Sequence, residues 1–303
     1  MRLLDLATAV ASAALLTTSI AKPTFKSGRL NENKPAQEAK QIQRRDDAEA
    51  NKYFNEPGGT IELGHYDARY FHGLVSDEER RDTQSHMIRA YLNFFRENEL
   101  DTWIAHGTLL GWWWNGKRLP WDFDLDTQVS DATLLHLGDA YNQTRYKYTS
   151  SDGKTSREYF LDVNPWIWQR ERGDGMNVID ARWIDLRNGL FIDITGLAEI
   201  HPDSHPGVWS CKNYHLYKTT ELYPMRKTMF EGVVAKVPYA FDKILVDEYS
   251  DGALINTQFN GHEWDPQLKE WVKTQQTLKQ EEEERKAKEK EAEDKKSEQA
   301  RLD

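Results

Sequence analysis

A single cysteine, Cys211, is present among 303 residues, so the chain cannot form an intrachain disulfide. The fold must therefore be stabilised by a hydrophobic core, and the hydrophobic content of 38% is sufficient for one domain of ordinary size or two small ones. His215 follows nearby, but no third group that would orient it is evident. We interpret Cys211 as a buried structural residue rather than as a nucleophile.

No block of lysine and arginine stands apart from acidic neighbours, and the net charge is −10. An acidic surface repels a phosphate backbone, which argues against nonspecific nucleic-acid binding. Neither a Gly-x-Ser-x-Gly motif nor a P-loop occurs in the chain. The segment "HPDSHP", His201 to Pro206, contains two prolines, so we interpret it as a surface turn rather than as a zinc site.

Long apolar runs are confined to the N-terminus. Residues 1–21 combine an early arginine, an apolar run and small residues before position 22, which predicts a signal peptide cleaved after Ala21. A membrane span needs roughly 20 apolar residues, so a retained anchor is the second interpretation. Entry into the secretory pathway would make Asn142-Gln143-Thr144 an N-glycosylation sequon.

Both ends of the chain have little apolar surface to bury. Residues 22–52 are polar and almost free of aromatic residues, which predicts a disordered linker. Residues 273–303 form a tail rich in Lys and Glu, which is either a solvated single helix held by i,i+4 ion pairs or disordered. The folded part is therefore expected over residues 53–272, as a single domain.

The periodicity of apolar residues predicts helices and strands within this domain. Ser76 and Glu79 have the spacing of a capping box, and the apolar residues that follow recur with a helical period. A short strand is expected at 101–105, a helix from Leu109 to Trp114, and a strand over 121–129, followed by further strands. This order predicts an α/β or α+β domain built around one mixed sheet.

The segment "WDFDLDTQV" alternates acidic and apolar residues. On a strand, the side chains of Asp122, Asp124 and Asp126 would project from one face, and the apolar side chains from the other. Like charges on one face repel one another unless a ligand is bound. Carboxylate oxygens suit Mg²⁺ or Mn²⁺, so we predict a divalent metal site; a solvated edge strand is the alternative.

Gly107 and Thr108 stand at the expected strand-to-helix turn upstream of the acidic segment. A glycine there allows the backbone to approach a ligand closely, and the amides of a helix N-terminus favour an anion. The threonine hydroxyl would add a donor. The dipeptide alone is a weak signal, but together with the acidic strand it indicates a nucleotidyltransferase arrangement.

These segments resemble the LicD family, which includes bacterial phosphocholine transferases and the fukutin-related proteins of animals. The resemblance rests on "HGTLLG" followed by "LPWDFDLDTQV", and "GWWWNGK" between them is similar to fungal LicD-type proteins of mannan mannosylphosphorylation. It covers about residues 76–265. The resemblance implies an α+β, nucleotidyltransferase-like fold with a mixed sheet flanked by helices, and transfer of a phosphorylated group from a nucleotide-activated donor to a sugar hydroxyl.

The resemblance also implies roles for single residues. Asp124 and Asp126 match the metal pair, with Asp122 just before them, and Gly107 and Thr108 match the phosphate-binding turn. Asp193 matches a later acidic residue, which would be a metal ligand or the base for the acceptor hydroxyl. Many bacterial members have an arginine where Trp114 stands. Either Lys117 or Arg118 would then contact the phosphate, or Trp114 would stack on a base or sugar.

Asn188-Gly189 predicts a two-residue hairpin turn. In that register Ile184 faces Asp193, and Asp193 shares its face with Arg182, which could neutralise a phosphate. Asp185 would lie on the opposite face, so only one of these two aspartates can enter the site. We select Asp193, with a purely structural pair between Asp193 and Arg182 as the alternative.

Three functions remain open from the sequence. A metal-dependent enzyme of the secretory pathway, in the Golgi lumen or secreted, would transfer mannose 1-phosphate from GDP-mannose to a glycan hydroxyl of cell-wall mannoprotein. Alternatively, the enzyme would be a LicD-type phosphotransferase that uses a CDP-linked donor. A non-catalytic regulator would use the same fold and the charged tail to contact a second transferase subunit. The third possibility is an ordinary metal-dependent glycosyltransferase, whose Asp-x-Asp motif also binds a nucleotide sugar. The Gly-Thr turn before the acidic strand favours the LicD type over it.

Overall fold

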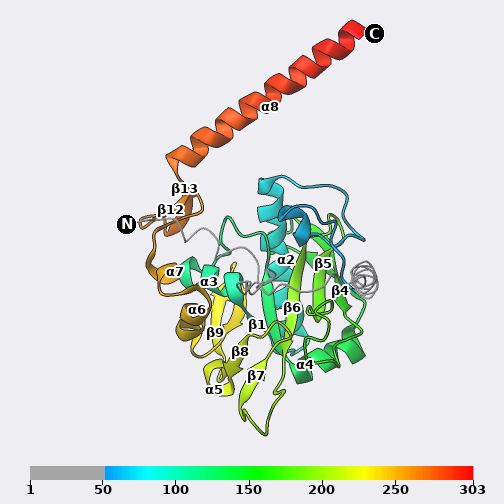
Figure 1. The fold of residues 1–303 in the computed structure, drawn as a ribbon, viewed down its shortest axis with the longest axis vertical. Helices are drawn as coiled ribbons and strands as arrows, with labels where there is room; N and C mark the ends of the chain where they lie inside the picture. Colours follow the sequence, from blue (N-terminus) through cyan, green and yellow to red (C-terminus); the bar gives the residue numbers. More distant parts are fainter. Residues whose placement is uncertain (1–51, 303) are drawn as a thin grey trace, which may run out of the picture.

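A six-stranded mixed sheet forms the centre of the structure, which is a computed structural model describing residues 52–302 (Figure 1). The predicted signal peptide and nearly all of the predicted linker lie outside the described residues. The strand order is β1 (Trp103–Ile104), β2 (Asp126–Ser130), β6 (Phe191–Leu197), β5 (Ala181–Asp185), β4 (Ser156–Val163) and β3 (Thr144–Thr149). Strands β2 and β6 are parallel, and every other neighbouring pair is antiparallel. The α+β class with one mixed sheet is therefore confirmed.

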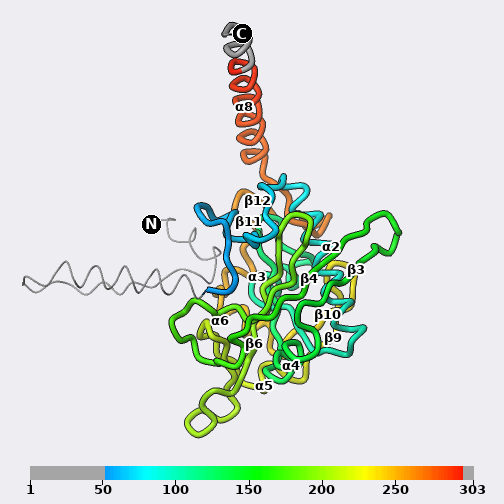
Figure 2. Tube along the Cα trace, turned by 90° about the vertical axis from the view of Figure 1, so that its right-hand side faces the viewer, coloured from blue at the N-terminus to red at the C-terminus, as the bar shows by residue number. Residues whose placement is uncertain are grey.

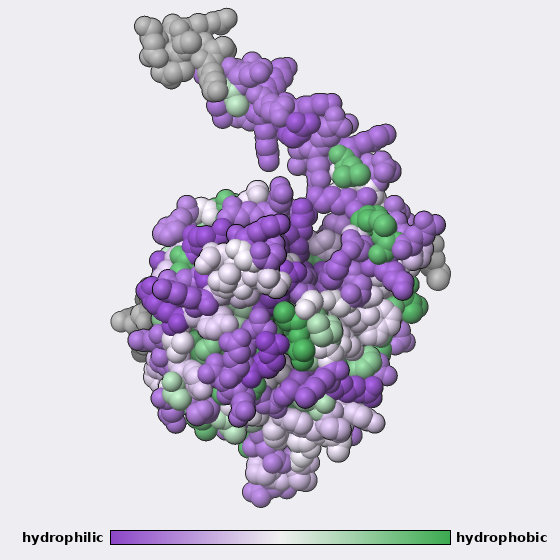
Figure 3. Space-filling view, turned by 180° about the vertical axis from the view of Figure 1, so that it is seen from behind, coloured by the Kyte–Doolittle hydropathy of each residue, from purple (hydrophilic) through white to green (hydrophobic). Residues whose placement is uncertain are grey.

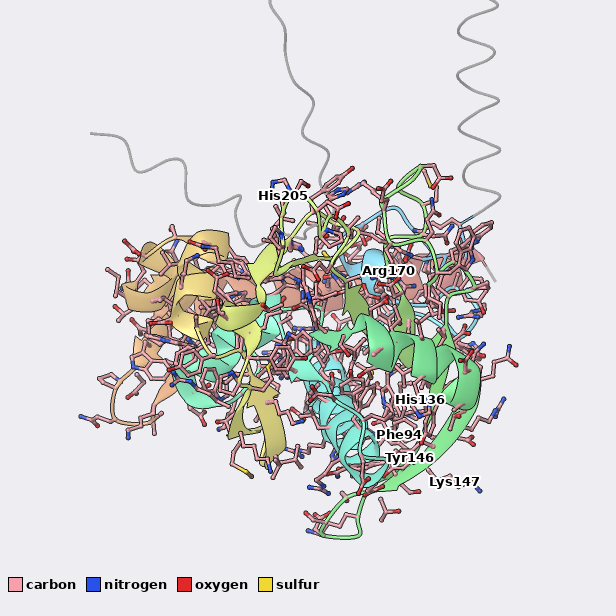
Figure 4. The ribbon with its side chains drawn as sticks, turned by 90° about the horizontal axis from the view of Figure 1, so that it is seen from below. Phe94, His136, Tyr146, Lys147, Arg170 and His205 are labelled. Carbon is pink, nitrogen blue, oxygen red and sulfur yellow. The ribbon has the colours of Figure 1, made fainter. Side chains whose placement is uncertain are left out.

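Helix α2 (Asp77–Glu97) packs on the sheet through its aromatic face. Phe94 lies 5.1 Å from Trp183 of β5 and 5.5 Å from Tyr146 of β3, measured between ring centroids (Figure 4). The predicted cap is confirmed, because the Ser76 hydroxyl accepts a hydrogen bond from the backbone amide of Glu79 at 3.1 Å. This helix supplies much of the hydrophobic core.

Shorter helices and small sheets surround this centre (Figures 1 and 2). The helices are η1 (Glu62–His65), α3 (His106–Asn115), α4 (Asp131–His136), the π-helix η2 (Leu137–Tyr141), α5 (Thr219–Leu222), α6 (Phe241–Tyr249) and α7 (Gly252–Ile255). The additional strands are β7 (Val208–Ser210), β8 (Leu216–Lys218), β9 (Arg226–Phe230), β10 (Val233–Val237), β11 (Gln258–Phe259), β12 (His262–Asp265) and β13 (Glu270–Lys273). The predicted strand before α3 and the predicted helix are both confirmed.

The acidic segment is only partly a strand, which corrects the expectation for residues 121–129. Strand β2 begins at Asp126, and the residues before it form an irregular segment. Helix α2 supplies the reason, because the guanidinium of Arg80 donates to the backbone carbonyls of Pro120 and Asp122. Carbonyls bound by a side chain are not available to a neighbouring strand.

The hairpin between β5 and β6 has a longer turn than the predicted two residues. Arg182 pairs with Asp193 and Ile184 with Phe191, so the predicted register is wrong by two residues. Contacts with a distant segment determine the conformation of the turn. Tyr66 forms a β-bridge to Leu190, and the backbone of Tyr70 and Phe71 packs against Gly189. Side chains alternate with a period of two, so the shift leaves each residue on its predicted face.

The C-terminal tail forms helix α8 (Gln275–Leu302), the helical one of the two alternatives. It extends away from the domain and is mostly hydrophilic (Figures 1, 2 and 3). Ion pairs at i,i+4 spacing run along it, as between Glu282 and Lys286 and between Arg285 and Glu289. Among the described helices, none is long and apolar enough to cross a membrane.

Candidate active site

Three of the four predicted acidic residues border one cavity of about 570 Å³. Its lining includes Asp124, Asp126 and Asp193. Asp126 and Asp193 are direct partners on the parallel strands β2 and β6, so their side chains share a face of the sheet. Asp185 is buried on the opposite face of β5, pairing with Tyr159 of β4. The structure therefore places Asp193, and not Asp185, beside the other two carboxylates.

The charges of this cluster are strongly coupled. Burial, followed by the charge of Asp124, raises the pKa of both Asp122 and Asp126 well above the usual range. Burial acts in the same sense on Asp124, but interaction with His65 and Asp122 outweighs it and lowers the pKa of Asp124 to about 2. Without a cation the cluster thus favours one ionised carboxylate beside protonated neighbours, and a bound cation would allow more of them to ionise.

Asp122 faces helix α3 and does not line the cavity. Its Oδ2 atom lies 2.5 Å from the position that a Cβ of Gly107 would occupy, so any larger residue at 107 would displace the carboxylate. The Thr108 hydroxyl is 2% exposed and accepts a hydrogen bond from the backbone amide of Asp126 at 2.9 Å. Gly107 and Thr108 therefore position the acidic segment, and their predicted contact with phosphate remains a prediction.

Arg182 supplies a buried cation to the cavity wall and is only 3% exposed. Its Nε atom donates to Asp193 at 2.9 Å, one terminal nitrogen donates to Glu56, and the guanidinium lies 3.6 Å from the ring centroid of Phe191. The other terminal nitrogen, Nη1, has no hydrogen-bond partner among the described residues. Nη1 does lie 4.0 Å from Oδ2 of the buried Asp67, so the charge of Arg182 is balanced by Asp193, Glu56 and Asp67 together.

His106 is a second cationic residue on the wall. Its Nδ1 atom lies 3.0 Å from Glu248 of α6, which also accepts from the Tyr217 hydroxyl at 2.7 Å. Burial would lower the pKa of His106, but the charge of Glu248 outweighs it and raises the pKa to about 9. The backbone φ of His106 is +49°, a left-handed conformation that side chains rarely adopt.

The sequence interpretation missed several of these residues. Glu56 and His65 lie upstream of the segment that resembled a known family, and Glu248 is distant in sequence from its partner His106. His65 faces Asp124, with 3.7 Å between Nε2 and Oδ2. No local pattern marks these positions, although His106 was part of the quoted "HGTLLG" segment. Its left-handed backbone could not be inferred from sequence.

The structure corrects the predicted phosphate contact of Lys117. Its side chain is 54% exposed and pairs with Glu270 of β13, outside the cavity lining. The reason is Gly116, whose left-handed conformation ends α3 and turns the chain away from the cavity. Arg118 does not line the cavity either.

Trp114 belongs to an aromatic cluster rather than to the cavity. Its indole nitrogen donates to the Ala253 carbonyl at 3.1 Å, and its ring packs 4.7 Å from that of Trp271. The predicted stacking of Trp114 on a base or sugar is therefore not supported by its position.

Cys211 and the segment from His201 to Pro206 lie where the sequence interpretation expected them, in the interior and in a surface turn. Cys211 is buried, its Sγ atom lies 3.3 Å from Nδ1 of His215, and burial raises the pKa of its thiol. A protonated thiol fits the structural interpretation, although both residues line the cavity. His201 and His205 lie in an exposed turn at the edge of the molecule (Figure 4).

The donor chemistry of the cavity fits a hard divalent cation. Within residues 52–302, no three side chains of His, Cys, Asp or Glu are arranged so that they could hold a metal ion by themselves. Mg²⁺ at phosphoryl-transfer sites is commonly held by one or two carboxylates together with substrate phosphates and waters. Asp124 and Asp126 at the cavity surface, with Asp193 beside them, provide ligands of that kind.

Comparison with known proteins gives one family and two relatives. Residues 99–240 match the family model described as LicD/FKTN/FKRP, nucleotidyltransferase domain. In Saccharomyces cerevisiae, Mannosyltransferase regulator 4 is 38% identical over 154 residues, which is 48% of this chain and 13% of that protein. Mannosyltransferase regulator 14 is 36% identical over 155 residues, 48% of this chain and 16% of that protein. The chain therefore spans only a small part of the length of these relatives.

Proposed function

Because residues 99–240 are a nucleotidyltransferase domain of the LicD family, we propose that this chain transfers a sugar phosphate from a nucleotide-activated donor to a glycan hydroxyl. The family and the names of the two relatives indicate a role in glycosylation. We further propose GDP-mannose as the donor and a mannoprotein glycan of the cell wall, reached in the Golgi lumen or after secretion, as the acceptor.

The pairing of Asp126 with Asp193 on adjacent parallel strands carries this proposal. It brings two carboxylates to one cavity wall beside Asp124 and the buried cation of Arg182. An acceptor hydroxyl would attack the sugar-linked phosphorus, its proton would pass to Asp193, and GMP would leave as the phosphorus–oxygen bond to it breaks. Arg182 and His106 would neutralise the diphosphate, so that positioning and electrostatics supply most of the catalysis.

Asp124 and Asp126 would hold Mg²⁺ or Mn²⁺ together with the donor phosphates, which leaves Asp193 as the base. Such an ion neutralises phosphate charge and aligns the reacting groups. Asp122 would act behind them, since its carboxylate lies against Gly107.

The test is a transfer assay with the full chain, Mn²⁺, GDP-mannose and a mannose oligosaccharide, read as GMP release and formation of a phosphodiester. We expect Asp126→Asn and Asp193→Asn to reduce turnover at least about 100-fold, as removal of a main electrostatic group commonly does. Asp139→Asn changes an exposed aspartate and serves as the matched control. Full activity in both site variants would overturn the proposal.

A second candidate is a non-catalytic regulator, favoured by the names of both yeast relatives. In that case the chain would be inert in the assay above and would instead raise the activity of a separate mannosyltransferase. Adding the purified chain to such an enzyme distinguishes the two functions. Activation that survives Asp126→Asn would support the regulator.

A further inference from the structure

Three exposed aromatic side chains lie on two segments that also line the cavity. Trp166 and Trp168 belong to the loop over residues 164–177 and are 38% and 65% exposed, with ring centroids 5.7 Å apart. Tyr214, 70% exposed, lies on the neighbouring turn between Cys211 and His215. We call these three residues the aromatic rim. Exposed side chains of this size leave apolar area in water, which suits them to bind a ligand.

Residues close to the rim in the chain form part of the cavity wall. Arg172 and Asp174 of the same loop line the cavity, and so does Asn213, next to Tyr214 in the chain. Arg172 connects the two segments, because its Nη1 atom donates to Asn213 at 2.9 Å and its guanidinium lies 5.5 Å from the Tyr214 ring centroid.

The loop that carries the two tryptophans is held by buried polar contacts. Lys212, 2% exposed, donates to the Trp166 carbonyl at 3.0 Å and pairs with Asp180 at 2.9 Å. Arg170 also pairs with Asp180 and donates to the carbonyls of Ile167 and Gly196 (Figure 4). A fixed backbone means that the aromatic surface exists before a ligand binds, which lowers the entropic cost of binding.

The surroundings of the rim favour a carbohydrate over an apolar partner. Polar residues follow the two tryptophans in "WIWQRERGD", and Gln169, Glu171 and Arg172 can exchange hydrogen bonds with hydroxyls. A pyranose ring presents an apolar face of C–H groups and a polar edge of hydroxyls, and a tryptophan face matches the first. A cavity of about 570 Å³ has the size that holds one ligand. With the donor in the cavity, the acceptor would bind outside it, where the two segments expose the rim.

We infer that the aromatic rim binds the glycan acceptor, with Trp168 stacking on a pyranose ring and Arg172 contacting its hydroxyls. This rests on the proposed function for the identity of the cavity ligand. Binding of the glycan itself requires no catalysis.

The experiment titrates the full chain with mannotriose and measures the dissociation constant by ligand-observed NMR, without a donor. We expect Trp168→Ala to weaken binding about fivefold or more, as loss of one aromatic contact does, and Trp168→Tyr to retain most of it. Tyr239→Ala removes an exposed aromatic far from these two loops and is the matched control. Its affinity should equal that of the unaltered chain.

Two results would overturn the inference: no mannotriose binding by the unaltered chain, or equal affinity in Trp168→Ala. Binding of phosphatidylcholine vesicles that depends on Trp168, in place of sugar binding, would assign the rim to a membrane and also overturn it. Failure of the proposed function looks different. In that case mannotriose binds through Trp168, but no transfer from GDP-mannose is seen.

Discussion

Asp126 illustrates how a candidate site residue can oppose folding when no cation is bound. Burial and the charge of Asp124 raise its pKa, so the native state keeps the proton to higher pH than the unfolded chain does. Between the two pKa values the native state binds more protons, and stability falls as pH rises. At pH 7 Asp126 therefore destabilises the protein that lacks a metal ion.

We expect Asp126→Asn to raise the free energy of unfolding at pH 7 by about 1 kcal/mol. At pH 4 the native Asp126 is protonated, so the difference should nearly vanish. Urea unfolding at both pH values in the presence of EDTA measures this, with Asp139→Asn as control. A variant that is less stable at both pH values would mean that Asp126 stabilises the fold by a neutral hydrogen bond.

His106 also makes stability fall as pH rises, but its contribution at pH 7 is stabilising, because the raised pKa favours the charged form of a histidine. Its pKa is raised to about 9 by Glu248 against the effect of burial, so its contribution is fully present below its unfolded pKa of about 6.5. That contribution is lost as the pH rises through 9.

The stability of the unaltered chain should therefore fall by up to a few kcal/mol between pH 6.5 and 9. His106→Asn should show a flatter profile, and asparagine tolerates the left-handed backbone at this position. Urea midpoints across this range provide the measurement. Identical slopes for both proteins would show that the ion pair with Glu248 is not formed in solution.

At the scale of elements, the sequence predicted correctly those features that depend on contacts between residues close together in the chain. Helix α2 was predicted correctly from the cap at Ser76 and from the helical period of the apolar residues after it. The period of two in the β5–β6 hairpin likewise predicted the correct face of the sheet for each side chain. The start of β2 could not be predicted, because Arg80 of another element binds the carbonyls before it. The hairpin register likewise depends on contacts of Gly189 with a distant segment. Distant contacts leave no periodic signal in the sequence.

Helix α8 has two parts that should respond differently to truncation. Its first turns contact the domain, because the Thr277 hydroxyl donates to the Gly261 carbonyl at 2.8 Å and Lys273 pairs with Glu281. Residues 279–295, beyond these turns, are exposed and form i,i+4 ion pairs, which contribute little to stability in water.

Deleting residues 283–303 should therefore leave the melting temperature of the domain unchanged within error. Deletion from residue 275 should cost at most about 1 kcal/mol, since it also removes the Thr277 hydrogen bond. Differential scanning calorimetry of both truncations measures this. A large loss of stability in the shorter deletion would contradict the solvated-helix description.

At the scale of the whole molecule, the cavity is completed by a segment outside the family match. Residues 52–75, which we call the N-terminal strap, are tied to three parts of the domain. Glu56 binds Arg182 of β5, Arg69 binds Asp162 of β4 at 2.6 Å, and His65 faces Asp124. Sequence resemblance could indicate the carboxylates of the site, but not the strap, because its residues act through contacts across the fold.

A cavity closed by the strap should bind its ligand only in the folded state, which makes thermal stability a direct readout of donor identity. A ligand present at about 100 times its dissociation constant stabilises the folded state by about 2.7 kcal/mol, or roughly 5–10 °C for a domain of this size. With Mn²⁺ present, we expect GDP-mannose to give such a shift and CDP-choline or a UDP-sugar to give less. Asp124→Asn should abolish the shift, because the diphosphate would lose the cation that holds it.

A shift with CDP-choline alone would mean that the donor is CDP-linked and that the chain is still a transferase. If no nucleotide changes the melting temperature, the domain does not bind a donor, and the regulator becomes the function that the fold supports.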